Sequence, residues 1–214
     1  MSIMKMETQC TLCGTQGVLF SKFNGKKYFN CNVCESIFMH PEDYLTTQEE
    51  EERYKEHNND VYDPRYQEFV APIVKAVQSD YRPDGIGLDY GCGTGPVISK
   101  LLKDEGYELK LYDPFFANNP ENLKIKYDYI VCCEVMEHFH NPEKEFHRLR
   151  SLLKSGGAIF MKTKLYSEDI NFENWYYRND PTHVFFYRKE TLEWIQKYFK
   201  FSDVTIEDKY IKFI

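Results

Sequence analysis

The stretch that decides the fold is Leu88-Asp89-Tyr90-Gly91-Cys92-Gly93-Thr94-Gly95. The residues before it, 86–88, read as the end of a short strand, and residues 96–102 read as the first turns of a helix. Its three glycines allow positive φ angles and a close approach of the backbone to a ligand. Free N–H groups at the helix start favour a negatively charged group. The sequence therefore predicts a nucleotide-binding turn, with the spacing G-x-G-x-G in place of the G-x-G-x-x-G of dinucleotide enzymes.

A carboxylate follows at the end of the next predicted strand, which covers residues 107–112. Asp113 lies 22 residues after Gly91, close to the offset of roughly 20 residues at which a carboxylate binds ribose hydroxyls in a βαβ unit. The alternative is a tight turn between strand and helix that binds nothing. Because the glycines, the carboxylate and the strand-helix-strand order occur together, we expect a ribose-containing ligand.

The glycine pattern and Asp113 together resemble a class I S-adenosylmethionine-dependent methyltransferase over residues 60–214. The resemblance implies a Rossmann-like α/β sheet of seven strands with helices on both faces. It also implies S-adenosylmethionine as cofactor, and a sulfonium donor needs positioning more than a chemical partner. The residues it assigns to the cofactor are Asp89, Gly91, Cys92, Gly93, Thr94, Gly95 and Asp113.

Composition limits the remaining choices. The 214 residues allow one or two domains, and 42% hydrophobic residues suffice for one ordinary core. The net charge of −7 argues against a whole-protein electrostatic grip on nucleic acid, so no DNA partner is expected. There is no run of about eighteen apolar residues and no apolar signal-peptide core at the start, so we expect no membrane contact and a cytoplasmic protein with reduced cysteines.

Four of the seven cysteines form a C-x2-C-x17-C-x2-C pattern made of Cys10, Cys13, Cys31 and Cys34. Four thiolates in a closed tetrahedral set select zinc in a structural role. Between the two pairs, apolar runs flank Asn24-Gly25, a typical hairpin turn. The pattern predicts an N-terminal zinc ribbon, with disulfides as the alternative that a reducing compartment disfavours.

Two helices are predicted between the ribbon and the glycine-rich turn. The first is acidic and solvated, with Thr47 and Glu50 as a capping box, and is expected to be a linker. The second follows Asp63-Pro64 and carries one apolar stripe that should pack on the sheet. The expected division is a zinc ribbon over 1–42, a linker with N-terminal helices over 43–79, and a methyltransferase domain over 80–214. The polar stretch between the helices, residues 54–59, either covers the cofactor or is an ordinary surface connection.

Little room separates Asp113 from the next strand at residues 127–133. A full crossover helix does not fit there. We therefore expect the third strand and its helix to be shortened or missing, which departs from the superfamily pattern at the adenine pocket.

Polar side chains follow the strand at 127–133, where strand ends face the ligand crevice of an open α/β sheet. Glu134-x-x-Glu137-His138 puts two carboxylates and an imidazole on one turn, a plausible site for a hard divalent cation. Further on, a long aromatic loop at residues 171–187 contains His183 in an Asp-x-x-His segment and is expected to carry function. Its rings at 175–177 either stack on a planar substrate or roof the pocket.

These residues are similar to the metal site of small-RNA 2′-O-methyltransferases and to the Glu-x-x-Glu-His segment of ubiquinone-biosynthesis O-methyltransferases. The similarity implies that Glu134, Glu137, His138 and His183 are the catalytic residues, acting on the acceptor directly or through Mg²⁺ or another divalent cation that lowers its pKa. Nearly the whole chain also resembles a bacterial group of S-adenosylmethionine methyltransferases through its segments at 113–116, 137–140 and 180–184.

The expected function is transfer of a methyl group from S-adenosylmethionine to a nucleophile, expected to be oxygen, of a small molecule. Two alternatives remain open. An RNA methyltransferase would use the lysines and aromatic rings of the ribbon as an RNA grip, and a non-enzymatic adaptor would use the ribbon to bind a protein.

Overall fold

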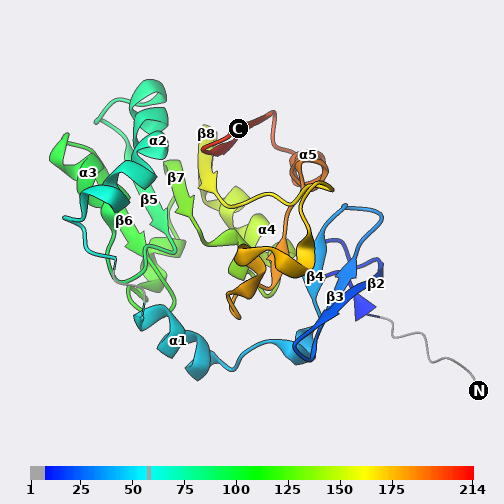
Figure 1. Cartoon of the computed structure of the whole chain (residues 1–214). Helices are drawn as coiled ribbons and strands as arrows, with labels where there is room; N and C mark the ends of the chain where they lie inside the picture. The colour runs from blue at the N-terminus through cyan, green and yellow to red at the C-terminus, as the bar shows by residue number, and fades with distance from the viewer. Residues whose placement is uncertain (1–7, 57–58) are drawn as a thin grey trace, which may run out of the picture.

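A mostly parallel sheet organises the structure, a computed structural model that describes residues 8–56 and 59–214 (Figure 1). Among these residues the sheet has six strands in the order β10-β11-β8-β7-β5-β6. They are β5 (Ile86–Tyr90), β6 (Glu108–Tyr112), β7 (Tyr127–Cys133), β8 (Leu153–Lys162), β10 (Val204–Ile206) and β11 (Ile211–Phe213). The first four run parallel, whereas β10 and β11 pair antiparallel at one edge.

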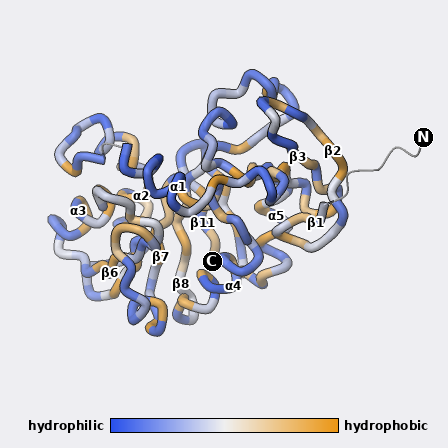
Figure 2. The backbone as a smooth tube through the Cα atoms, turned by 90° about the horizontal axis from the view of Figure 1, so that it is seen from below, coloured by the Kyte–Doolittle hydropathy of each residue, from blue (hydrophilic) through white to orange (hydrophobic). Residues whose placement is uncertain are grey.

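Helices cover both faces of this sheet, which confirms the predicted Rossmann-like α/β fold. The alternation of side chains along β7 explains the two layers. Tyr129 and Val131 pack against α2 (Pro64–Asp80) and α3 (Val97–Asp104), whose apolar stripes form one core cluster. Ile130 and Cys132 face the other way, where α4 (Pro142–Leu152) and α5 (Lys189–Tyr198) pack. The most hydrophobic segments lie inside the fold and the hydrophilic ones along its outer helices and loops (Figure 2).

The connection between β6 and β7 confirms that the third strand is missing. Along this described segment there is only an isolated bridge between Asp113 and Ala117 and a short 3-10 helix, η2 (Pro120–Leu123). The seven strands implied by the resemblance are therefore reduced to six. One edge of the ligand crevice is left without the usual strand and helix.

The N-terminal segment forms a second, antiparallel sheet in the order β1-β2-β3-β4-β9. Its strands are β1 (Thr8–Gln9), β2 (Gln16–Phe23), β3 (Lys26–Asn30), β4 (Ile37–Met39) and β9 (Phe185–Phe186). The hairpin of β2 and β3 turns at Asn24 and Gly25, both with positive φ, as predicted. The last strand, β9, comes from the aromatic loop near the other end of the chain. Buried residues of both sheets belong to one hydrophobic cluster.

The helix α1 (Thr47–Lys55) begins one residue earlier than predicted. Its capping box is made by Thr46 and Glu49, so the predicted pair of Thr47 and Glu50 is wrong. Two overlapping T-x-x-E patterns are present, and Glu50 is excluded from capping because it is buried and contacts His140. The connection from η1 (Pro41–Asp43) through α1 runs from the ribbon to the larger sheet (Figure 1). No helix of the described residues is long and apolar enough to cross a membrane.

Candidate active site

The glycine-rich turn joins β5 to α3 in a backbone conformation that glycine makes accessible. Gly91 and Gly93 have φ angles of 77° and 61°, in the left-handed region that disfavours other residues. The Gly91 N–H donates to the Tyr112 carbonyl at 2.8 Å, which ties the turn to the end of β6. A Cβ on Gly91 would lie 2.5 Å from Val135. The turn is therefore packed closely between the ends of β6 and β7.

Asp113 is held rigidly beside this turn. Its Oδ2 accepts a hydrogen bond from the Gly93 N–H at 3.0 Å, and its Oδ1 accepts from the N–H groups of Phe115 and Phe116 at 2.9 and 3.1 Å. The side chain is buried yet lines the cavity described below. Oδ2 has a second lone pair, so the group can still accept a hydrogen bond from a ribose hydroxyl. This geometry fits the role expected of Asp113.

The other residues assigned to the cofactor divide into two sets. Cys92 and Thr94 line the cavity together with Gly91 and Gly93. Asp89 lies beneath the turn, where it accepts a 2.7 Å hydrogen bond from the Ser99 hydroxyl of α3 and does not line the cavity. Burial raises its pKa to about 6. The geometry therefore gives Asp89 an indirect role, in fixing the turn to α3.

Gly95 also lies outside the cavity lining. A Cβ at this position would lie 1.7 Å from the Asn59 carbonyl oxygen. The chain between α1 and α2 therefore rests on the turn at Asn59, which lines the cavity, and this favours the expectation that the segment covers the cofactor. Of that polar stretch, residues 57 and 58 lie outside the described residues.

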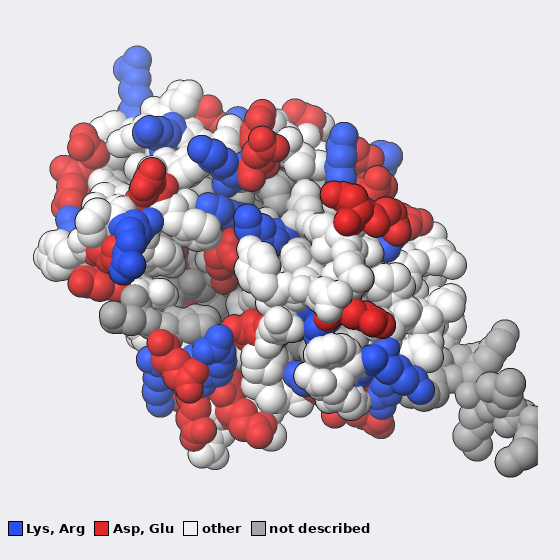
Figure 3. All heavy atoms as spheres, in the orientation of Figure 1, with Lys and Arg blue, Asp and Glu red and all other residues white. Residues whose placement is uncertain are grey.

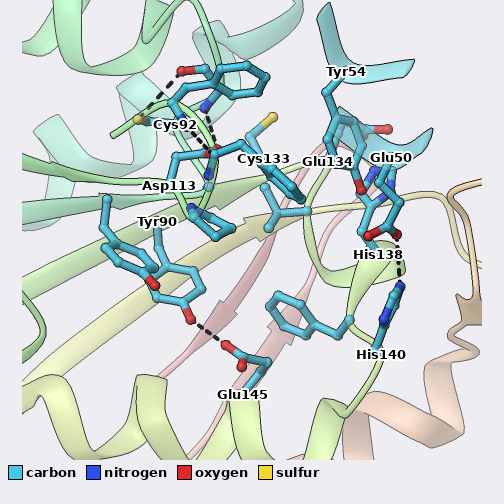
Figure 4. A pocket seen from close by; sticks show the side chains of 18 of the residues that line it. Glu50, Tyr54, Tyr90, Cys92, Asp113, Cys133, Glu134, His138, His140 and Glu145 are labelled. Atoms are coloured by element: carbon cyan, nitrogen blue, oxygen red, sulfur yellow. Dashed lines mark hydrogen bonds and ion pairs between the residues drawn. The ribbon is translucent and has the colours of Figure 1, made fainter. Parts of the chain in front are cut away.

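A cavity of about 740 Å³ extends from the turn to the ends of β7 and the aromatic loop (Figure 4). The helix α1, expected to be a linker, forms one of its walls through Glu50 and Tyr54. Glu50 Oε1 lies 2.8 Å from His140 Nε2, and Arg53 donates to Asp180 at 2.7 Å. The Glu50–His140 contact and the Arg53–Asp180 ion pair thus attach α1 to the loops that face it across the cavity.

Four predicted site residues converge at one end of this cavity, and we call Glu134, Glu137, His138 and His183 the carboxylate–histidine cluster. Nε2 of His138 lies 3.9 Å and Nε2 of His183 lies 4.0 Å from Glu137 Oε1. Ligand atoms of these three residues lie within 4.8 Å of one another. Glu134 joins them through Tyr177, whose hydroxyl lies 2.5 Å from Glu137 Oε1 and 3.1 Å from Glu134 Oε2. Residues from the turn after β7, from η3 (Met136–His138) and from the aromatic loop therefore meet, as the sequence predicts.

The hydrogen bonds of the two imidazoles define their tautomers. Nδ1 of His138 contacts the Thr182 carbonyl at 3.1 Å, and Nδ1 of His183 contacts the Tyr177 carbonyl at 2.6 Å. Because a carbonyl only accepts, each Nδ1 carries a proton, and Nε2 is the nitrogen of each ring that lies toward Glu137. This arrangement is typical of metal-binding histidines, whose other N–H donates to a backbone carbonyl.

Burial of Glu137 and partial burial of Glu134 disfavour the charged forms of both carboxylates. Glu137 is fully buried, and burial together with the charge of Glu134 raises its pKa to about 8. Burial also raises the pKa of Glu134. Among the described residues, Glu134 Oε1 and Glu137 Oε2 have no hydrogen-bond partner. The carboxylate oxygens of Glu134 and Glu137 and the ring nitrogens of His138 and His183 are ligand types that fit a divalent cation.

Tyr177 was predicted only as a stacking or roofing ring. Neither it nor its neighbours Trp175 and Tyr176 line the cavity, so neither stacking on a substrate nor roofing the pocket is supported for these rings. Instead, its hydroxyl bridges the two carboxylates, and burial raises its pKa so that the phenol keeps its proton. Glu50 and Arg53 were not predicted as site residues either. Their only sequence signal is a dense acidic run, which is ordinarily solvated.

The four cysteines of the N-terminal segment lie together on the ribbon, and all are free thiols. Their sulfurs lie within 4.8 Å of one another, with Cys13 and Cys31 at 3.3 Å and Cys10 and Cys34 at 3.5 Å. Zinc bound by four sulfurs at about 2.3 Å requires sulfur separations of roughly 3.8 Å. The set therefore fits a structural zinc ion.

Comparisons with known proteins agree with this geometry. A family model described as a methyltransferase domain matches residues 56–206. The tRNA U34 carboxymethyltransferase of Campylobacter fetus is 29% identical over 112 residues, 42% of this chain and 40% of that protein. The ubiquinone biosynthesis O-methyltransferase of Salmonella newport is 27% identical over 77 residues, 36% of this chain and 32% of that protein. The chain thus spans less than half the length of either relative.

Solved structures support the same fold. The 1,6-didemethyltoxoflavin-N1-methyltransferase of Burkholderia thailandensis, with bound S-adenosylhomocysteine, has a TM-score of 0.53 at 10% identity and covers 91% of this chain and 96% of its own. CalO1, a methyltransferase in calicheamicin biosynthesis, has a TM-score of 0.50 at 13% identity and covers 69% of this chain and 54% of its own. Because the family model covers more than half of the chain and the glycine-rich turn and Asp113 lie where the fold requires, this chain belongs to the methyltransferase domain family, as a class I S-adenosylmethionine-dependent methyltransferase domain.

Proposed function

We propose that this chain transfers the methyl group of S-adenosylmethionine to an oxygen nucleophile of a small molecule, with a divalent cation held by the carboxylate–histidine cluster. One observation carries the proposal. A single cavity connects Asp113 and the glycine-rich turn at one end with Glu134, His138 and His183 at the other. A methyl donor bound at the first end would present its sulfonium toward an acceptor at the second.

The reaction requires few protein groups. The acceptor oxygen attacks the methyl carbon in line, the sulfur–carbon bond breaks, and the electron pair stays on the sulfur of S-adenosylhomocysteine. Asp113 and the N–H groups of the turn hold the cofactor. The hydroxyl proton passes to Glu134, the carboxylate of the cluster that lines the cavity and whose pKa is raised by burial.

The metals have separate roles in the proposal. A divalent cation bound by Glu137, His138 and His183, with Glu134 beside it, would lower the pKa of the acceptor hydroxyl and orient it. Cys10, Cys13, Cys31 and Cys34 would hold zinc in a purely structural role. We assign the zinc ribbon to residues 1–42, the connecting helices to 43–79 and the transfer chemistry to 80–214. We also propose that the chain acts in the cytoplasm, where the four thiols stay reduced.

RNA is the second candidate acceptor, because one relative is named for a modification of tRNA. The charge of the chain argues against it. The net charge is −7, and basic and acidic side chains alternate over the face in Figure 3. RNA binding depends on phosphate neutralisation. A small-molecule acceptor inside the cavity fits these charges better.

Calorimetric titration tests the two halves of the proposal separately. We expect wild-type protein to bind S-adenosylhomocysteine, and Asp113→Ala to weaken that binding at least about tenfold. The exposed Asp104→Ala variant on α3 is the matched control. We expect Mn²⁺ to bind the wild type and to bind Glu137→Gln at least about tenfold more weakly, with exposed Glu121→Gln as control. Unchanged cofactor binding in Asp113→Ala would contradict the cofactor site, and equal Mn²⁺ binding by both proteins would contradict the metal site.

A further inference from the structure

The sheet of the ribbon does not end within the N-terminal segment. Strand β4 pairs antiparallel with β9, so that Ile37 faces Phe186 and Phe38 faces Phe185. Strand β9 belongs to the aromatic loop, and His183 precedes it by two residues. A strand of two residues is too short to be stable alone. The edge of β4 therefore fixes the position of the loop that carries His183.

Two backbone hydrogen bonds continue from the ribbon to the carboxylate–histidine cluster. The Met39 N–H donates to the Val184 carbonyl at 2.8 Å, and the Val184 N–H donates to the Glu137 carbonyl at 3.0 Å. Val184 is fully buried between them. Two successive hydrogen bonds thus join Met39, the last residue of β4, through Val184 to the backbone of Glu137.

Side chains of the β2–β3 hairpin hold the preceding part of the same loop. The guanidinium of Arg178 lies 3.7 Å from the centre of the Phe23 ring, and Lys26 donates to the Pro181 carbonyl at 3.2 Å. Tyr28 packs edge-to-face on Phe172 at 5.1 Å. These rings, which would be needed to stack on RNA bases, are directed into the protein instead.

Two of the four cysteines, Cys31 and Cys34, lie directly before β4 in the chain. Cys31 and Cys34 form the knuckle that directly precedes Ile37, and the Cys31 N–H donates to the Ser36 carbonyl at 2.9 Å. Cys34 is fully buried in the same core cluster as Phe185. Because a ribbon of this size has little core of its own, we expect its folding to depend on its metal.

We propose that the zinc-loaded ribbon is the scaffold that positions His183 and Glu137, so that zinc occupancy determines the order of the carboxylate–histidine cluster. The consequence for methyl transfer rests on the function proposed above. The physical coupling does not, because it consists of the β4–β9 pairing and the contacts of the loop. The ribbon residues Met39, Phe23 and Lys26 are positioning residues in this proposal, and they act through the loop.

Hydrogen exchange followed by mass spectrometry tests the coupling in the full chain. In Cys13→Ser, which removes one zinc ligand, we expect the zinc content to fall and the amides of residues 178–187 to exchange at least about tenfold faster. Amides of β5 should change less than about twofold, because β5 lies in the centre of the other sheet. Loss of zinc with unchanged exchange at 178–187 would overturn the proposal.

A second variant leaves the cysteines intact, and it tests the coupling between the ribbon and the aromatic loop even if Cys13→Ser unfolds throughout. Phe23→Ala removes the ring under Arg178, and we expect it to keep its zinc while residues 178–184 exchange faster. Val33→Ala, an exposed substitution within the second knuckle, is the control and should change neither. Unchanged exchange in Phe23→Ala would contradict the scaffold role. Binding of S-adenosylhomocysteine, measured on the same samples, reports separately on the proposed function.

Discussion

Replacing Gly95 by alanine tests how the chain between α1 and α2 closes over the cofactor turn. Gly95 is not in the left-handed region, so an alanine there carries no φ penalty. The added Cβ would lie 1.7 Å from the Asn59 carbonyl oxygen, whereas real Cβ atoms essentially never come closer than 3.0 Å. Asn59 or the turn must therefore move by about 1.3 Å or more, and overpacking of this kind costs about 1–3 kcal/mol.

We expect this cost to appear mainly in ligand affinity, because Asn59 lines the cavity and its segment rests on the turn. Every 1.4 kcal/mol corresponds to about tenfold in affinity. The dissociation constant of S-adenosylhomocysteine, measured by calorimetry, should rise by about tenfold or more. Gly156→Ala is the control, since its φ is 76° and nothing lies within 4 Å of the added Cβ. It should lower stability by about 1 kcal/mol without changing affinity. Wild-type affinity in Gly95→Ala would refute the packing of Asn59 on the turn.

Three further predictions follow from packing and charge. Asp89→Asn should gain stability relative to wild type as the pH rises from 4 to 7. Burial raises the pKa of Asp89 from 3.8 to about 6, so the folded wild type loses up to roughly 3 kcal/mol of stability as the acid ionises. An equal difference in urea midpoint between the two proteins at both pH values would contradict this. The loss of stability in Gly91→Ala should be partly reversed by Val135→Ala, because the second change removes the 2.5 Å contact but not the strain of a φ of 77°. A double-mutant cycle of unfolding free energies that shows no coupling would rule that contact out. Arg53→Met should speed the dissociation of S-adenosylhomocysteine in stopped-flow measurements, because the ion pair of Arg53 with Asp180 attaches α1 across the cavity. An unchanged dissociation rate would show that α1 does not retain the ligand.

Local patterns were sufficient to predict the glycine-rich turn and the place of Asp113 beside it. The glycines and Asp113 form a turn and a strand end whose geometry depends on nearby residues, and the short connection before Tyr127 predicted the missing strand correctly. The Asn24-Gly25 hairpin is equally local. The capping box was misplaced by one residue because the sequence offers two such patterns. Only the burial of Glu50 against His140, a contact across 90 positions, distinguishes them.

No local pattern indicates the features that depend on the longest-range contacts. Strand β9 consists of two phenylalanines in an aromatic loop, and its partner β4 lies nearly 150 residues earlier, so no periodicity reveals the pairing. The bridging role of Tyr177 depends on the same tertiary packing. Residues that line a cavity from a distant helix, such as Glu50 and Tyr54, likewise carry no local pattern that separates them from a solvated face.

The central claim is methyl transfer to an oxygen acceptor assisted by the carboxylate–histidine cluster. The most direct measurement follows labelled methyl from S-adenosylmethionine into an extract of the source organism, separated into small molecules, RNA and protein. It is made with Mg²⁺ or Mn²⁺ and with a chelator mild enough to leave the ribbon zinc bound. We expect label in a small molecule that disappears with the chelator and with Glu137→Gln. Label that persists under both conditions would contradict the role of the cluster, and no label in any fraction would contradict the proposed activity.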